Sequence, residues 1–196
     1  MNQNRYTREA MVICGLLFLG LFQLFAHPTG TTLEGARVDI FGDDSKDVVV
    51  ILFVAVECPI SNRFAPEVNR IYEEFENGDF QMWAVYTDEL FTRKEIEAHR
   101  SDYQYRMPAL IDFDRALAQY CGASVTPEAA VFIREDSGEY RMVYRGRVNN
   151  QYVDFGKWRP RPTKHDLREV LELLAGGKSD SIAFRSTEAI GCYIGE

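Results

Sequence analysis

The feature that most constrains the fold of this chain is a run of nine consecutive apolar residues at positions 48–56. A run of this length is typical of a strand that is buried on both faces of a sheet, and it is too short to span a membrane. Apolar residues then recur at intervals of three and four, at Phe64, Val68, Ile71 and Phe75. The sequence therefore predicts a central strand that leads into a helix.

Cys58 lies where this strand passes into the helix. Pro59 suits the first helical position, since proline lacks an N–H that would have no partner there. Cys58 is therefore expected to be the N-cap residue, where unpaired N–H groups and the positive end of the helix dipole favour a thiolate over a thiol. The prediction is a reactive thiol that solvent can reach.

Two observations oppose a reactive Cys58. Cysteine is among the residue types most often buried, so the competing interpretation makes Cys58 a small apolar core residue. Glu57 beside it carries a carboxylate that disfavours a neighbouring thiolate, although successive side chains of a strand point to opposite faces. The position of Cys58 at the junction of strand and helix favours the reactive interpretation.

The composition of the 196 residues indicates one domain with appendages. Hydrophobic residues make up 46% of the chain, which suffices for a single core and excludes a disordered protein. The net charge of −8 shows no footprint of nucleic-acid binding. His27, His99 and His165 are far apart and form no ligand-spaced cluster with cysteines, so neither a metal site nor a bound cofactor is expected.

Residues 1–26 are interpreted as a targeting segment. Arg5 and Arg8 precede an apolar run at 10–26, which is longer than a usual signal-peptide core and just short of the roughly 20 residues of a full span. Basic residues on its N-terminal side place the rest of the chain outside. The sequence predicts an exported domain that is anchored by this segment or cleaved from it, and Cys14 within the run is assigned no chemistry.

The predicted elements alternate between strand and helix and end with an antiparallel hairpin and a last helix. This order implies an α/β domain with a mixed central sheet and helices on both faces. The domain is assigned to residues 36–176, with a linker at 27–35 before it and a tail at 177–196 after it. The expected strands cover residues 37–41, 48–56, 80–86, 107–111, 129–133 and 140–144. Helices are expected to begin at Pro59, at Thr92, which forms a capping box with Glu95, and at Asp112. Thr163 is expected to cap a last helix, which ends at Gly176 and Gly177.

Two features together resemble the thioredoxin superfamily. Cys58-Pro59 follows the central strand, and Val125-Thr126-Pro127-Glu128 stands just before the predicted hairpin. In that superfamily a cis proline before the hairpin faces the reactive cysteine, and the cis turn leaves backbone groups exposed to pair with an extended sulfur-bearing partner. The resemblance implies a thioredoxin-like fold in which Thr126 and Pro127 lie beside the catalytic Cys58.

In more detail, the chain is similar to the exported redoxin-domain proteins of the AhpC/TSA group. The similar segments are 58–63, 126–129, 144–150 and 191–194, and the overall match covers about residues 35–175. Proteins of that group are bacterial, and in some of them the domain is joined to cytochrome c-like domains. The resemblance implies a thiol oxidoreductase with peroxiredoxin-like antioxidant activity, at the periplasmic face of the inner membrane, with cytochrome c-like electron-transfer proteins among its partners.

The chain departs from the best-known motifs of this superfamily. A peroxiredoxin motif would place proline at Ile51 and threonine at Ala55, so the hydroxyl that orients a peroxide is missing. A thioredoxin motif would place tryptophan at Glu57 and cysteine at Ser61, so the local resolving thiol is missing too. A copper-delivery domain would want a second cysteine near Asn62 and a downstream histidine, and neither is evident. What remains is an active site with one local cysteine.

A cluster of cations follows the hairpin in this otherwise acidic chain. In a thioredoxin-like fold the second hairpin strand runs parallel to the strand before Cys58, so the loop after it emerges at the same end of the sheet. This region carries Arg145 and Arg147, and three more cations lie between residues 157 and 161. One interpretation is a solvated loop. The functional interpretation is a cationic rim at which Arg145 and Arg147 bind an anionic partner or favour the Cys58 thiolate.

The leading hypothesis is an exported thiol oxidoreductase in which Cys58 attacks a protein disulfide or a hydroperoxide and a second thiol resolves the product. Cys192 is the predicted resolving residue, because the tail is long enough to reach Cys58 and Ile190, Tyr193 and Ile194 give its end an apolar surface with which to dock. A long tail is equally able to leave Cys192 free or to pair it between molecules.

Cys121 closes a short predicted helix and is expected to be buried rather than to resolve Cys58. The alternative to an enzyme is a redox-silent module of the same fold. Such a module would bind a protein partner through the face that carries Cys58 and Pro127. The sequence names neither the substrate nor the physiological reductant.

Overall fold

The computed structural model describes residues 27–76, 78–178 and 182–195. The predicted targeting segment at 1–26, with Cys14, lies outside them. The described strands are β1 (Thr29–Thr32), β2 (Arg37–Asp39), β3 (Val48–Val54), β4 (Phe80–Tyr86), β5 (Ala109–Ile111), β6 (Val125–Thr126), β7 (Glu128–Arg134), β8 (Tyr140–Gly146), β9 (Tyr152–Asp154), β10 (Lys157–Trp158), β11 (Arg185–Ser186) and β12 (Cys192–Tyr193). The described helices are α2 (Pro59–Phe75), α3 (Arg93–Asp102), α4 (Ala116–Cys121) and α5 (Asp166–Ala175).

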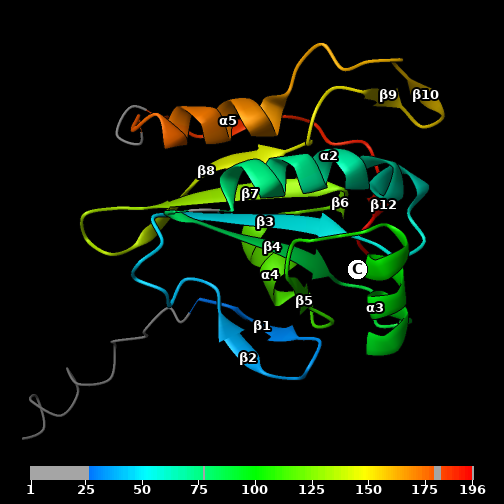
Figure 1. Cartoon of the computed structure of the whole chain (residues 1–196), viewed down its shortest axis with the longest axis horizontal. Coiled ribbons are helices and arrows are strands. Elements are labelled where there is room, and N and C mark those ends of the chain that lie inside the picture. The colour runs from blue at the N-terminus through cyan, green and yellow to red at the C-terminus, as the bar shows by residue number, and fades with distance from the viewer. Residues whose placement is uncertain (1–26, 77, 179–181, 196) are drawn as a thin grey trace, which may run out of the picture.

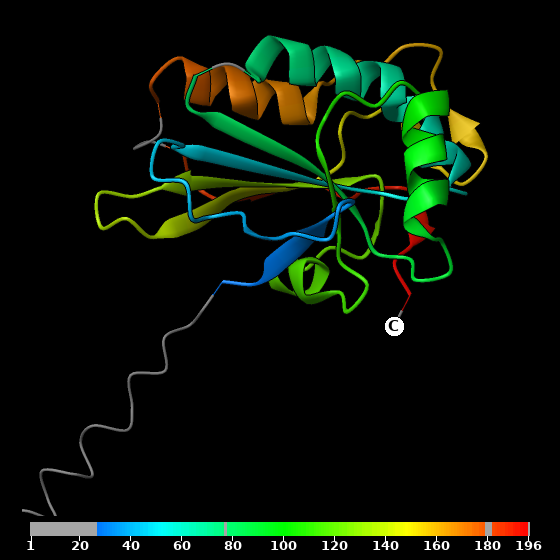
Figure 2. The ribbon, with the colours of Figure 1, turned by 60° about the horizontal axis from the view of Figure 1, so that its bottom comes forward.

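An eight-stranded mixed sheet forms the centre of the described residues, in the order β11-β8-β7-β3-β4-β5-β1-β2 (Figure 1). Within it, β3 pairs in parallel with β4 and antiparallel with β7. Helices α2 and α5 lie on one face of the sheet and α4 lies on the other, which Figure 2 shows from a second direction. The predicted mixed α/β sheet with helices on both faces is confirmed.

Strand β3 contributes to both hydrophobic cores. All seven of its residues are buried. Val50 and Leu52 belong to the core beneath α2 and α5, whereas Ile51 and Phe53 belong to the core against α4. Because strand side chains alternate between the two faces, a strand that is covered on both sides needs an unbroken apolar run.

The hairpin of β7 and β8 brings the chain back to the end of the sheet that carries Cys58. Strand β7 is antiparallel to β3, and β8 is antiparallel to β7, so β8 runs parallel to β3 as predicted. At the end of β8, Gly146 has a φ of +149°. A side chain there would collide with the backbone of Thr187, so glycine permits the tail to lie against β8.

The predicted linker at residues 27–35 was wrong for much of its length. Residues Thr29–Thr32 form β1, which pairs antiparallel with both β2 and β5. Thr31 lies opposite Ile111, and Thr32 lies opposite Leu110. The segment lacks apolar alternation, so its backbone pairing with two neighbouring strands, and not its hydrophobicity, makes it a strand.

The predicted cap of the last helix was also wrong. Helix α5 begins at Asp166, and its N-cap residue His165 makes no side-chain cap bond. Thr163 binds Asn150 instead: its N–H donates to Asn150 Oδ1, and its hydroxyl accepts from Asn150 Nδ2, each at 2.8 Å. The apolar face predicted for this helix is confirmed, since its four inward residues are buried: Leu167, Val170, Leu171 and Leu174.

Two other local predictions for helix ends are confirmed. Thr92 and Glu95 form a capping box at α3, with Glu95 N–H donating to the Thr92 hydroxyl at 3.3 Å and Thr92 N–H donating to the Glu95 carboxylate at 2.8 Å. Gly176 caps the end of α5.

Among the helices described here, none combines the length and the apolar character that crossing a bilayer requires.

Asp112 caps α4 from inside the core. Its two carboxylate oxygens accept hydrogen bonds from the N–H groups of Leu117 at 3.0 Å and Ala118 at 2.9 Å. Burial raises the pKa of Asp112 from 3.8 to about 6, and these two hydrogen bonds offset burial only in part. In the native protein the Asp112 carboxyl group therefore stays protonated over a pH range in which the same group of the unfolded chain is ionised.

We expect Asp112→Asn to remove one component of the pH dependence of stability. Between about pH 4 and pH 6 the unfolded chain binds fewer protons at this position than the native protein, so the contribution of Asp112 to the free energy of unfolding falls as the pH rises. Across this window the wild type should lose on the order of 1–3 kcal/mol relative to the variant. Urea unfolding of both proteins at several pH values measures this difference. A difference that stays constant with pH would contradict the assignment.

Candidate active site

Cys58 is the N-cap residue of α2, as predicted. Its backbone is extended, Pro59 follows at the first helical position, and its sulfur accepts a hydrogen bond from the Ser61 N–H at 3.3 Å. Glu57 is exposed whereas Cys58 is buried, so the carboxylate points away from the thiol. The expectation of a solvent-reachable thiol was wrong, because Cys58 is only 1% exposed.

The turn before β7 lies directly against this thiol. The Thr126–Pro127 peptide bond is cis. The Cys58 thiol donates a hydrogen bond to the Thr126 carbonyl at 3.1 Å. The predicted cis bond and its position beside Cys58 are therefore both confirmed, and the turn supplies the acceptor for the thiol.

The C-terminal tail forms the third side of the site. Strand β12 pairs antiparallel with β6, with Cys192 opposite Thr126 and Tyr193 opposite Val125. The Thr126 hydroxyl donates to the Cys192 carbonyl at 3.4 Å. Gly191 is packed so closely against Thr126 that a side chain there would meet its backbone. The tail end docks on the domain, as expected, although the side chain of Tyr193 points into solvent.

Docking of the tail brings Cys192 next to Cys58, since Cys192 lies opposite Thr126, whose carbonyl accepts the hydrogen bond of the Cys58 thiol. Burial and then the neighbouring Cys58 raise the pKa of Cys192, so Cys192 stays protonated at neutral pH. Both cysteines are free thiols in this state. The structure therefore brings the predicted pair together in its reduced form.

Cys121 lies apart from this pair, on α4 in the opposite core. It is buried, and burial together with the carboxylates of Asp112 and Glu128 raises the pKa of its thiol far above the usual range. A thiol held in its protonated form is a poor nucleophile. The predicted structural role of Cys121 agrees with this environment.

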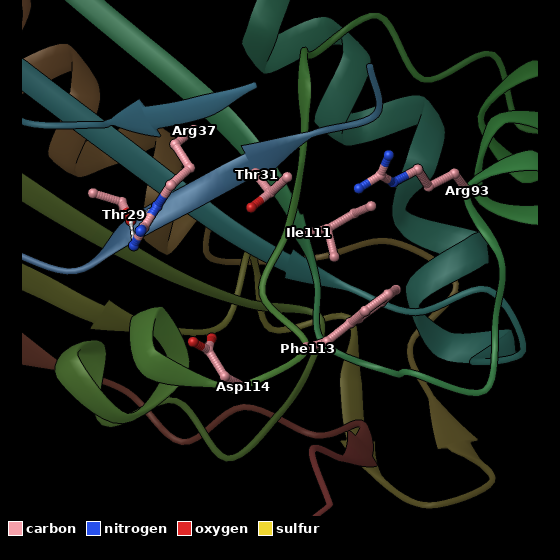
Figure 3. A pocket seen from close by; sticks show the side chains of 7 residues that line it. All are labelled: Thr29, Thr31, Arg37, Arg93, Ile111, Phe113 and Asp114. Atoms are coloured by element: carbon pink, nitrogen blue, oxygen red, sulfur yellow. Dashed lines mark hydrogen bonds between the residues drawn. The ribbon is translucent and has the colours of Figure 1, made fainter. Parts of the chain in front are cut away.

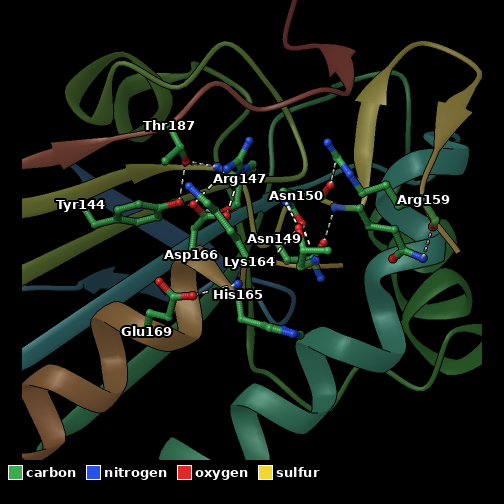
Figure 4. A network of polar contacts seen from close by, with 12 residues as sticks. Tyr144, Arg147, Asn149, Asn150, Arg159, Lys164, His165, Asp166, Glu169 and Thr187 are labelled. Carbon is green, nitrogen blue, oxygen red and sulfur yellow. Dashed lines mark hydrogen bonds and ion pairs between the residues drawn. The ribbon is translucent and has the colours of Figure 1, made fainter. Parts of the chain in front are cut away.

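Arg145 and Arg147, the predicted substrate-binding rim, make polar contacts within the fold. Arg147 makes two hydrogen bonds to the Asp166 carboxylate, at 2.8 and 3.1 Å, which Figure 4 shows. Arg145 donates to the Gly122 carbonyl at 3.0 Å, and its Nε lies 3.8 Å from the Glu128 carboxylate. Both guanidinium groups are engaged within the fold, because carboxylates from distant parts of the chain lie beside them.

A buried polar relay supports the turn that carries Cys58, and sequence reasoning missed it. Asn62 Nδ2 donates to the Val56 carbonyl at 2.9 Å, so Asn62 Oδ1 must accept from His99 Nε2 at 2.8 Å. His99 Nδ1 then accepts from the Tyr86 hydroxyl at 3.0 Å. This assigns neutral His99 with the proton on Nε2, which agrees with burial lowering its pKa.

The relay joins three elements that are distant in sequence: the start of α2, the middle of α3 and the end of β4. The only sequence signal was the spacing of Asn62, one helical turn after Cys58.

Ser61, which stands where thioredoxins have their second cysteine, is fully buried, and no hydrogen-bond partner for its hydroxyl lies in the described part of the chain. The segment around Cys58 therefore contributes one cysteine to the site, as predicted.

The pocket drawn in Figure 3 is separate from the thiol pair. It has a volume of about 460 Å³ and is lined by Thr29, Thr31, Arg37, Arg93, Ile111, Phe113 and Asp114. None of these lining residues belongs to the Cys58 site. Across residues 27–76, 78–178 and 182–195, no group of three His, Cys, Asp or Glu side chains is placed to hold a metal ion.

A comparison with protein families matches residues 25–143 to the AhpC/TSA family. The chain belongs to the AhpC/TSA family. The matched residues exceed half of the chain and include β3, Cys58 and the Thr126–Pro127 turn. A search among curated proteins found no significant sequence match.

Solved structures share the fold of this AhpC/TSA member at low sequence identity. An uncharacterised conserved protein from Geobacillus kaustophilus has a TM-score of 0.71 at 20% identity, over 87% of this chain and 90% of that one. A hypothetical protein from Sinorhizobium meliloti has a TM-score of 0.65 at 22% identity, over 85% and 89%. A secreted disulfide oxidoreductase from Mycobacterium tuberculosis has a TM-score of 0.51 at 17% identity, over 77% and 96%. The predicted thioredoxin-like fold is confirmed.

We expect Asn62→Ala to destabilise the protein by about 1–3 kcal/mol, because it leaves the Val56 carbonyl and the His99 N–H without their partners. Asn69→Ala on the same helix is the matched control, since the hydrogen bonds of Asn69 to Gln104 and Arg106 lie at the surface, where water replaces them. Urea unfolding of both variants measures the costs. Equal costs would show that the relay adds nothing to the stability of the Cys58 turn.

Proposed function

We propose that this AhpC/TSA protein is a thiol-disulfide oxidoreductase in which Cys58 is the nucleophile and Cys192 is the resolving cysteine. The observation that carries the proposal is the pairing of Cys192 with Thr126, whose carbonyl accepts from the Cys58 thiol beside the cis Thr126–Pro127 bond. Three features favour attack by Cys58: its position at the start of α2, the Ser61 N–H donated to its sulfur, and the exposure of Glu57, whose carboxylate points away from the thiol.

The proposed reaction has two exchange steps. The Cys58 thiolate attacks one sulfur of a partner disulfide, a mixed disulfide forms, and the other partner sulfur leaves as a thiolate that takes up a proton. Cys192 then loses its proton and attacks the Cys58 sulfur. This step forms the Cys58–Cys192 disulfide and releases the second partner sulfur as a thiol. The partner gains two electrons, and an external dithiol returns them to the Cys58–Cys192 pair.

A second candidate reaction is the reduction of a hydroperoxide, which membership of the AhpC/TSA family favours. Cys58 would attack the O–O bond, release an alcohol or water and become a sulfenic acid, which Cys192 would condense to the same disulfide with loss of water. Ala55 offers no hydroxyl to orient a peroxide. We therefore rank the protein disulfide first.

Location and electron supply are also proposals. Export to the periplasmic face of the inner membrane, anchored or cleaved, rests on Arg5, Arg8 and the apolar run at 10–26. Cytochrome c-like electron-transfer proteins are proposed partners on the family resemblance alone. The competing possibility is a redox-silent module that binds a protein through the Cys58 and Pro127 face, and the burial of Cys58 favours it.

Turnover with insulin as the disulfide probe and dithiothreitol as reductant separates these possibilities. We expect Cys58→Ser to lower the rate of insulin reduction by at least roughly 100-fold, because the thiol that remains at the site, Cys192, is held protonated at neutral pH and is a poor first nucleophile. When pre-reduced Cys192→Ser protein is mixed with insulin after dithiothreitol has been removed, it should stall as a mixed disulfide between Cys58 and an insulin chain, which intact-mass analysis detects. Cys121→Ala should retain the rate within about twofold, since its thiol is protonated and distant. A parallel assay with hydrogen peroxide ranks the two substrates.

Peptide mapping of the air-oxidised monomer tests the pairing directly. The expected product is a Cys58–Cys192 disulfide with Cys121 free. A Cys58–Cys121 link, or free thiols at both Cys58 and Cys192, would contradict the resolving role of Cys192. Insulin reduction that is unaffected by Cys58→Ser would refute the oxidoreductase and favour the binding module.

A further inference from the structure

Strand β12 pairs with the edge of β6, the strand that lies beside the Cys58 thiol. It is the only strand that pairs with β6 in the described part of the chain. The Thr126 hydroxyl donates to the Cys192 carbonyl at 3.4 Å, and the Ile194 N–H donates to the Ser124 carbonyl at 2.9 Å. A free strand edge is a place where an extended polypeptide adds through main-chain hydrogen bonds. The chain fills this edge with its own tail.

The tail is held firmly upstream of β12. Strand β11 pairs with β8, and Ile182 before it is buried in the core. The Thr187 hydroxyl hydrogen-bonds the Tyr144 hydroxyl at 2.7 Å and accepts from the Arg147 N–H at 3.2 Å, as Figure 4 shows. The backbone of Thr187 also packs against Gly146. Thr187 is therefore an anchor from which the last residues extend.

The last residues are held more weakly than this anchor. Tyr193 is 80% exposed, and neither Cys192 nor Ile194 is buried. Because hydrophobic stabilisation scales with the apolar area removed from water, the partly buried Ile190, Cys192 and Ile194 hold β12 less strongly than the buried Ile182 holds the anchor. It can leave β6 while Thr187 keeps the tail attached.

With β12 in place, the Cys58 sulfur is closed to an external partner. Its neighbours are the Thr126 carbonyl, the Ser61 N–H and the Cys192 thiol, and 1% of the residue is exposed. Exchange requires direct contact between Cys58 and a sulfur of the partner. The reduced protein in this conformation therefore cannot begin the reaction.

We propose that β12 is a displaceable cover that competes with the partner polypeptide for the edge of β6. This inference rests on the proposed function. An extended segment of a disulfide-bearing protein replaces β12 and presents its sulfur to the exposed Cys58. The tail, still tethered at Thr187, returns with Cys192, forms the Cys58–Cys192 disulfide and displaces the reduced partner from the same edge. Tail closure thereby couples resolution to product release.

Gly191 provides a way to loosen the cover without changing either cysteine. A Cβ at Gly191 would lie 2.6 Å from the Thr126 carbonyl carbon and closer still to its oxygen, and backbone atoms cannot move aside easily. At Gly195 the nearest atom to a Cβ is an Arg115 side-chain nitrogen at 3.7 Å, an ordinary contact. Gly195→Ala is thus the matched control for Gly191→Ala.

The test is the rate at which iodoacetamide labels Cys58 in the reduced full-length protein, measured on the Cys58 peptide by mass spectrometry. We expect Gly191→Ala to raise this rate by at least about tenfold, because an opened thiol reacts in proportion to its exposed population. Gly195→Ala should stay within about twofold of the wild type. Equal rates in all three proteins would overturn the proposal.

Two further measurements keep the test decisive. If Gly191→Ala fails to fold, a chain that ends at Thr187 keeps the anchor and lacks the cover, and slow labelling of its Cys58 would equally overturn the proposal. A synthetic peptide of residues 187–195 carrying Cys192→Ser, added to Gly191→Ala protein, should slow Cys58 labelling again. The same peptide carrying Gly191→Ala as well should not protect.

The outcomes distinguish the cover from the proposed function. Faster labelling of Gly191→Ala protein, combined with insulin reduction that does not depend on Cys58, would support the cover and refute the oxidoreductase. Unchanged labelling, combined with Cys58-dependent reduction, would refute the cover and leave the oxidoreductase standing. If both hold, Gly191→Ala should form the mixed disulfide faster than the wild type and resolve it more slowly.

Discussion

Strand β3 is buried along its whole length between α2 and α5 on one face and α4 on the other, and the rest of the site is placed relative to it. Its parallel neighbour β4 and antiparallel neighbour β7 fix where the chain can turn. The end of β3 delivers Cys58 to the start of α2, and the start of β7 delivers the Thr126–Pro127 turn to the same place. The thiol site therefore depends on the burial of one apolar strand.

The second sulfur reaches the site by a different route. Cys192 comes from a tail that is anchored at Thr187 and crosses to β6 over a few residues. A tether of this kind keeps a reactive group at high effective concentration without building it into the rigid core. The strand that carries the second thiol pairs with β6, whose Thr126 carbonyl accepts from the first thiol, so a single strand pairing brings the two cysteines together.

The polar groups near the site make contacts within the fold that hold its shape. Arg147 is paired with Asp166 and Arg145 with Glu128. The relay from Tyr86 through His99 to Asn62 fixes the turn before Cys58 with neutral groups only. The Cys58 sulfur itself accepts a hydrogen bond from the Ser61 N–H at the start of the helix.

The sequence by itself determined the features that local pattern controls. The apolar run identified β3, proline after Cys58 identified the N-cap, and Thr92 with Glu95 identified the start of α3, because each signal acts within a few residues. Only the tertiary structure decided that residues 29–32 form a strand, that Arg147 meets Asp166, that Asn62 meets His99 and that Cys192 lies on Cys58. These contacts join distant segments by strand pairing or through side chains. Contacts of this kind leave no periodic signal in the sequence.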